Sequence, residues 1–173
     1  MNFTIEKSLD ILERTPVLLF EMLNNISNDW IYKNEGGESW SVFDVVGHLI
    51  EGEKTDWIPR MKIILSDKID KTFEPFNRFS QLEEIQQKTL EQLLTDFAAL
   101  RKKNVKYLIS KQLSTKELAK KGIHPAFGEV TLFQLLSTWA VHDLNHIAQI
   151  SRIMAYQYKS DVGPWTAYLR ILQ

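Results

Sequence analysis

The strongest chemical signal in the sequence is a pair of histidines, His142 and His146, that lie four residues apart. Side chains at this spacing on an α-helix share one face, so two imidazoles can bind the same metal ion. The residues on either side are mostly apolar, and a buried imidazole needs polar partners for its ring nitrogens, which a metal ion supplies. The pair therefore predicts a metal site on a core helix, although one histidine bonded to a carbonyl and one exposed histidine would also fit the spacing.

A third histidine, His48, lies in another apolar stretch, between Val45 and Ile50. A lone histidine in such a stretch is more often a satisfied core residue than a ligand. Inward-facing histidines on two helices change that balance, because helical bundles build metal sites from facing helices. Three histidines and an open position are typical of catalytic zinc sites, whereas structural zinc sites have four protein ligands. We expect His48, His142 and His146 to bind a divalent ion, with Zn, Ni and Fe favoured, because imidazole suits these metals.

Other polar side chains are weaker candidates. Asp143 occupies the glutamate place of a His-Glu-x-x-His motif but is one methylene shorter, so we expect it to support the ligands or lie on the surface. Glu51 and Glu53 lie near His48; most such carboxylates are solvated, but one could orient an imidazole or accept a proton. His124 is either an ordinary surface residue, which we favour, or part of a pocket mouth. Arg60 is either a helix-end cation or a partner for an anionic substrate.

Helical periodicity dominates the segments that must position these residues. A first helical segment from Ile5 is broken at Thr15-Pro16, where Thr15 would cap the next helix, and ends at Gly36-Gly37. A second helix begins near Ser41, with Asp44 completing a capping box. Pro59 predicts a kink or an early end near residue 58.

Two further long helices follow. One begins at Ser80, with Glu83 in its capping box, and extends to Leu108; the other begins at Thr131, with Gln134 in its capping box. Residues 66–79 and 111–130 are long connections; a fixed turn is expected at residues 124–128, and no stretch is a convincing strand. Residues 165–172 are expected to pack back onto the bundle. We predict an all-α fold, a four-helix bundle with long crossover connections, in a single domain over residues 1–173.

Composition excludes several classes of protein. The 173 residues carry 21 basic and 22 acidic side chains, so the chain lacks the excess of basic residues that is typical of a nucleic-acid-binding protein. No cysteine is present, so disulfides, thiolate metal sites and cysteine nucleophiles are excluded. Apolar runs are far shorter than the ~20 residues of a membrane-spanning helix, and we expect the N-terminal residues not to be a targeting segment, because they include charged residues and form no apolar stretch. A cytoplasmic protein without nucleic-acid or membrane partners is expected.

Four stretches in order resemble a known family: Trp40-Ser41 with residues 45–49, residues 53–60, residues 124–132, and residues 138–150. Val162-Gly163-Pro164-Trp165 adds to the likeness. Over nearly the whole chain the sequence is similar to the DinB/YfiT-like superfamily, the DNA-damage-inducible family of metal-binding helical bundles.

The resemblance implies a four-helix bundle that is often a homodimer, with a divalent metal on three histidines that map to His48, His142 and His146. Characterised relatives include transferases and isomerases that use bacillithiol, mycothiol or glutathione, where the metal activates a low-molecular-weight thiol. Many relatives have no known activity, so the family indicates the metal better than the reaction.

Three hypotheses remain open from the sequence. The first is a metal-dependent enzyme, a thiol S-transferase or hydrolase, that activates a thiol or water for attack on a small electrophile. The second is a non-catalytic stress protein that binds a metal or small ligand through the same residues. The third is a structural interaction module without a metal.

Overall fold

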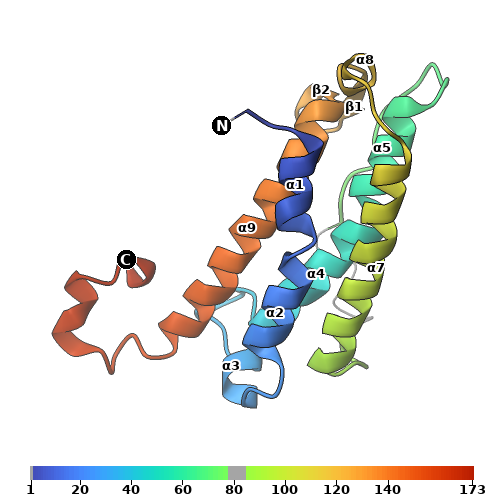
Figure 1. Cartoon of the computed structure of the whole chain (residues 1–173). Helices are drawn as coiled ribbons and strands as arrows, with labels where there is room; N and C mark the ends of the chain where they lie inside the picture. Colours follow the sequence, from blue (N-terminus) through green and yellow to red (C-terminus); the bar gives the residue numbers. More distant parts are fainter. Residues whose placement is uncertain (1, 78–84) are drawn as a thin grey trace.

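The computed structural model describes residues 2–77 and 85–173, and in these residues the long helices form a bundle with four arms (Figure 1). The first arm consists of α1 (Ile5–Leu12) and α2 (Thr15–Leu23), and the second of α4 (Val42–Thr55) and α5 (Trp57–Leu65). The third arm is the single helix α7 (Leu90–Ser110).

The fourth arm, α9 (Leu132–Tyr156), is the longest described helix. It packs against α1, α4 and α5, while α7 packs against α2 and α4. Figure 1 shows α1 lying beside the first half of α9. The predicted four-helix bundle with long connections is confirmed.

A proline accounts for the interruption in each of the two broken arms. Pro16 has no N–H group to donate to the carbonyl of Leu12, and α1 ends at that residue. Pro59 likewise cannot donate to the carbonyl of Thr55, where α4 ends before α5 begins. Both breaks were expected from the sequence, and each leaves a carbonyl free for another partner.

Capping boxes begin both helices that carry the three histidines. Ser41 and Asp44 form a capping box at the start of α4, and Thr131 does the same with Gln134 at the start of α9. These two predictions are confirmed. The prediction for Thr15 is wrong, because its hydroxyl donates to the carbonyl of Ile11 at 3.0 Å instead of capping α2.

The predicted start of the third long helix is also wrong. The continuous helix α7 begins at Leu90, and Thr89 and Gln92 form its capping box. Residues 86–89 are turns and irregular backbone, so a single helix from Ser80 to Leu108 is excluded. Ser80 and Glu83 themselves lie outside the described residues.

A β-hairpin interrupts the second long connection, where no strand was expected. Strand β1 (Lys121–His124) pairs antiparallel with β2 (Gly128–Thr131), and the predicted turn at residues 124–128 joins them. Ile123 also bridges to Thr72, so the hairpin holds the connection that follows α5. At Gly122 a Cβ atom would lie 2.5 Å from the Phe73 ring, and this close approach requires glycine. Four-residue strands with little alternation gave no sequence signal.

Short elements complete the described chain: α3 (Asn28–Tyr32), α8 (Thr115–Leu118) and two 3₁₀ turns, η1 (Gly163–Ala167) and η2 (Arg170–Leu172). The last turn packs against α9 and buries Leu172, as predicted for the C-terminal piece, whereas Trp165 and Tyr168 in the same piece are exposed. In the described residues no helix is long and apolar enough to span a membrane.

The buried apolar side chains form two clusters along the bundle. On α9 the first cluster includes Ile150 and Ile153, and the second includes Trp139 and Ala140. The residues between these positions, 141–149, include two buried polar side chains: Asp143, which faces α7, and His146, which faces α4. A polar layer inside an apolar core requires specific partners, and it contains the site.

Candidate metal centre

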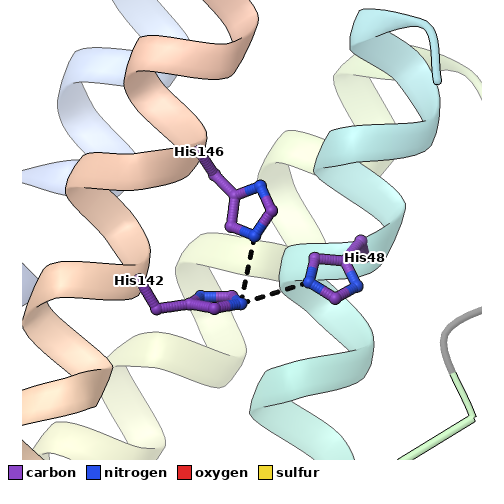
Figure 2. A group of neighbouring side chains, drawn as sticks. All are labelled: His48, His142 and His146. Carbon is purple, nitrogen blue, oxygen red and sulfur yellow. Dashed lines mark hydrogen bonds between the residues drawn. The ribbon is translucent and has the colours of Figure 1, made fainter. Parts of the chain in front are cut away.

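Three histidines from two helices point toward one another in the polar layer (Figure 2). The Nε2 atom of His142 lies 3.1 Å from Nε2 of His48 on α4 and 3.1 Å from Nε2 of His146 on α9. All three ligand atoms lie within 4.8 Å of one another, and no fourth histidine or carboxylate among the described residues joins the group. The structure thus brings together the three histidines that were singled out in the sequence.

Hydrogen bonding alone cannot satisfy these three nitrogens. A neutral imidazole Nε2 carries either one hydrogen or one lone pair, so Nε2 of His142 can serve one neighbour but not both. Ligands bound tetrahedrally at ~2.05 Å from a metal ion lie about 3.3 Å from one another, close to the observed separations. The donor chemistry and the spacing therefore fit a divalent ion held by three Nε2 atoms.

Burial keeps the imidazoles in the form that binds a metal. Burial, followed by the neighbouring histidines, lowers the pKa of His142 to about 2, and burial also lowers the pKa of His146. Both rings are therefore neutral near pH 7. Neutral imidazoles offer lone pairs, so no proton has to leave before a metal binds.

Neighbouring side chains orient the rings. The amide oxygen of Gln149 lies 2.7 Å from Nδ1 of His146; because that oxygen only accepts, the ring hydrogen is on Nδ1 and the lone pair of Nε2 faces the centre. Trp57 packs edge-on against His142 with ring centroids 5.1 Å apart, and Trp40 packs against His48 at 4.8 Å. The aromatic contacts limit ring rotation about the centre.

A second buried cluster lies on another side of α9, around Arg101 of α7. Its guanidinium binds Asp143 through two nitrogens at 2.5 and 2.9 Å, and Glu53 through Nε at 3.0 Å. The same group donates to the carbonyl of Leu12 at 2.9 Å, one of the two carbonyls freed by a proline. Asn104 donates to the other oxygen of Glu53 at 2.9 Å. We call these residues the Arg101 cluster; it joins α1, α4, α7 and α9 and fixes the distance between the helices that carry the histidines.

The Arg101 cluster changes the interpretation of three acidic residues. Asp143 is fully buried against Arg101, so it is neither a surface residue nor a base facing the histidines. Glu53 was expected to be solvated, like most such carboxylates, but it is buried, with 2% exposure. Glu51 is partly exposed and does not line the cavity beside the three histidines.

A cavity of about 640 Å³ opens beside the three histidines. Its walls come from α4, α5, α9, the hairpin and the connection after α5. His124 and Arg60 both line it, so the hairpin turn and the first turns of α5 contribute to the pocket. For His124 the expectation of an ordinary surface position is wrong, and Arg60 is 7% exposed instead of being a solvated helix-end cation. The cavity size suits a small organic molecule.

Arg60 and Asp56 form an ion pair in the cavity wall. Nη2 of Arg60 lies 2.7 Å from Oδ1 of Asp56, in a contact that lacks the alignment of a good hydrogen bond. Burial raises the pKa of Asp56 to about 6, against the opposing effect of the Arg60 charge. The guanidinium also lies over the ring of Phe73, 5.3 Å from its centroid.

Sequence reasoning missed several of these residues, and some carried a usable signal. Arg101 and Asn104 interrupt the apolar stripe of α7 at helical spacing from Phe97, which indicates inward-facing polar groups. Asp56 and Arg60 have the four-residue spacing of a helical ion pair. Phe73, in contrast, lies in an irregular connection and is placed only by its pairing with the hairpin.

The fold and the site together define a helical bundle with a three-histidine centre beside a small-molecule cavity. Residues 11–150 match the family model of the DinB superfamily, and the chain belongs to that superfamily. Among curated protein sequences none matches the chain.

Two solved structures share the fold. One, described as "YfiT from Bacillus subtilis is a probable metal-dependent hydrolase with an unusual four-helix bundle topology", aligns with a TM-score of 0.73 and 18% identity over 87% of each chain. The other, TT2238, described as a four-helix bundle protein, aligns with a TM-score of 0.51 and 20% identity over 86% of this chain and 98% of that one. At these identities the likeness establishes the fold.

Proposed function

We propose that the protein is a metal-dependent enzyme that activates a small thiol or water for transfer to, or hydrolysis of, a small electrophile. The observation that carries the proposal is the convergence of three imidazole nitrogens on the wall of a cavity. Three protein ligands leave room for a ligand from the cavity, whereas a structural site is closed by a fourth. The printed description of the Bacillus subtilis structure as a probable metal-dependent hydrolase agrees with this class of chemistry.

The chain's own residues would hold, orient and enclose the reactants. A divalent ion on His48, His142 and His146 would lower the pKa of a thiol or water molecule that binds it. Trp57 and Trp40 line the cavity next to these histidines and exclude water from one side of the centre. Since the chain has no cysteine, a thiol nucleophile has to enter from solution.

Metal binding and catalysis are tested separately. The protein is titrated with Zn²⁺, Ni²⁺ and Fe²⁺, and the loaded protein is then assayed with glutathione, bacillithiol, mycothiol or water and a model electrophile such as an aryl halide or an activated ester. We expect one metal ion per chain and a rate above that of the metal-free protein. If the protein binds one metal ion but is no faster than the metal-free protein, the non-catalytic binding protein is favoured. If it binds no metal, both the enzyme and the non-catalytic metal-binding protein are excluded.

His142→Ala is the decisive variant for the ligand assignment. Removing a ligand should lower metal affinity by more than the ~10- to 100-fold typical of residues that only support ligands. His124→Ala is the matched control, because His124 lies in the cavity but outside the metal group. Circular dichroism should show the same helical content in both variants. Unchanged metal affinity in His142→Ala would show that the ligand assignment is wrong.

A further inference from the structure

The cavity has a second polar end, away from the three histidines. On α5, Arg60 follows Trp57 by three residues, and Trp57 is the residue whose ring contacts His142. Arg60 therefore lies about one helical turn, ~5 Å, farther along the same face than the tryptophan. His124 lies at this end as well, because both its ring and the Arg60 guanidinium pack against Phe73.

A comparison with Arg101 shows that the binding capacity of Arg60 is only partly used. Both guanidinium groups are buried, with residue exposures of 7% for Arg60 and 2% for Arg101. All three nitrogens of Arg101 contact protein oxygens, including two carboxylates. Arg60 contacts one carboxylate, that of Asp56, and weakly the carbonyl of Glu74 at 3.4 Å, and both contacts use Nη2 alone.

The other two nitrogens of Arg60, Nε and Nη1, have no protein partner among the described residues, and they are not among the polar atoms sealed from solvent. Because Arg60 lines the cavity, their N–H groups are available to a molecule in it. Each two-nitrogen fork of an arginine includes Nη2, which Asp56 already contacts. Nε or Nη1 can still donate a single charge-assisted hydrogen bond to a carboxylate oxygen, so a ligand can supply the second carboxylate that Arg60 lacks.

His124 adds a hydrogen-bond donor at the same end. The backbone N–H of Ala126 donates to Nδ1 of His124 at 3.1 Å, so in the neutral ring the hydrogen is on Nε2. Phe127 stacks on the imidazole with ring centroids 4.4 Å apart and holds its orientation. Asp56, the one acidic residue among the described residues that lines the cavity, is already paired with Arg60. Glu51 interacts with Asp56, and the backbone carbonyl of Glu74 contacts Arg60, but neither residue lines the cavity.

Between the two polar ends the lining is largely aromatic. Phe73, Phe76, Trp40 and Trp57 all line the cavity, together with Leu135. A ligand that spans the cavity therefore has an apolar body between its two ends, and its length is about one to two helical turns, ~5–11 Å.

We propose that the cavity binds a small carboxylate with an apolar or aromatic body, held at its carboxylate by Arg60 and His124 and presenting its reacting group to the three histidines. The part of this inference that concerns the reacting group rests on the proposed function. The carboxylate subsite does not, because its residues and their free donors are independent of a metal. Arg60 is thus a residue that determines substrate specificity.

The test uses 4-phenylbutyrate and its uncharged analogue 4-phenylbutanamide, with binding followed by the fluorescence of the cavity tryptophans and by calorimetry. Both are measured in metal-loaded protein and after chelation, because a carboxylate can also bind a metal ion. We expect the chelated protein to bind the carboxylate ~10- to 100-fold more tightly than the amide, as charged hydrogen bonds imply.

Variants assign the preference to the subsite. Arg60→Gln should reduce the preference to within twofold, and Arg60→Lys, which keeps the charge but not the planar guanidinium with its several donors, should retain part of it. Arg170→Gln, at an exposed position of η2, is the matched control and should change nothing. If Arg60→Gln does not fold because Asp56 loses its partner, two other variants test the subsite. The double variant Asp56→Asn/Arg60→Gln should abolish the preference for the carboxylate. The single variant His124→Phe should reduce it.

The outcomes separate this inference from the proposed function. Equal affinity for the acid and the amide in chelated protein, or a preference that survives Arg60→Gln, would overturn the subsite even if the metal-loaded protein is active. A preference that depends on Arg60 in a protein without catalytic activity would support the subsite and count against the enzyme.

Discussion

The three-histidine centre and the Arg101 cluster are two buried polar groups that both join α4 to α9, yet they are satisfied in different ways. Around Arg101 the nitrogens and the carboxylate oxygens find partners within the protein. At the histidines, three nitrogens converge without a set of hydrogen bonds that serves them all, and Nδ1 of His142 is buried without a hydrogen-bond partner in the described part of the chain. A closed polar cluster stabilises the fold, whereas an open one is suited to a ligand.

The difference predicts that the largest loss of stability follows from breaking the closed cluster. Arg101→Met leaves the carboxylates of Glu53 and Asp143 buried without their cation, which should lower the free energy of unfolding by ~3–5 kcal/mol. Urea denaturation measures the loss. Arg170→Met on the surface should stay within about 0.5 kcal/mol of the wild type. A loss below about 1 kcal/mol for Arg101→Met would show that the cluster does not stabilise the bundle.

The ion pair of Asp56 and Arg60 is intermediate between the Arg101 cluster and the three-histidine centre. Its carboxylate is buried and paired with a cation, but Oδ1 of Asp56 has no well-aligned hydrogen bond. The pKa of Asp56 is about 6 in the folded chain against 3.8 ordinarily, so between these values the folded protein holds a proton that the unfolded chain has released. This group therefore lowers the free energy of unfolding as pH rises through that window, by at most about 3 kcal/mol. Asp56→Asn should remove that fall, even if the variant is less stable at every pH.

Urea unfolding between pH 4 and 7 tests this pH dependence. Asp70→Asn is a useful control, since hydrogen bonds from Thr72 lower the pKa of Asp70 from its ordinary 3.8. Its contribution to the pH dependence therefore lies below about pH 4, and Asp70→Asn should keep the wild-type slope in this window. The same pH slope in the wild type and in Asp56→Asn would contradict the raised pKa of Asp56.

The smallest effect is expected at the open cluster in the absence of metal. His142→Leu replaces a buried imidazole that lacks a partner for Nδ1 with an apolar side chain, so the free energy of unfolding should change by less than about 1 kcal/mol. Adding Zn²⁺ should raise the thermal midpoint of the wild type and leave that of the variant unchanged. If His142→Leu lowers the free energy of unfolding of the metal-free protein by more than about 2 kcal/mol, His142 stabilises the fold as Arg101 does, and the contrast between the two groups is wrong.

Local signals in the sequence predicted much of the fold. Capping boxes at Ser41 and Thr131 and the prolines at 16 and 59 fixed helix boundaries, because caps and prolines act on backbone groups a few residues away. The box predicted at Ser80 did not give the start of the continuous third helix, because α7 begins after a capping box of the same type, Thr89 with Gln92.

Long-range contacts explain what could not be predicted about the site. The spacing of His142 and His146 places both on one face, but the contact with His48 depends on how two helices dock. The burial of Glu53 and Asp143 depends on Arg101, which is 48 and 42 residues away from them. Likewise, Phe73 reaches the cavity only because the hairpin holds its connection, and no local pattern encodes that pairing.

The contact between Arg101 and the carbonyl of Leu12 has a consequence for how the protein folds. It spans 89 residues, and the contact between His48 and His142 spans 94. Contacts of such sequence separation form slowly, because the loop between them has to be closed before any interaction stabilises it. Individual helices can therefore form early, while the polar layer is assembled late, when α7 meets α1 and α9 meets α4.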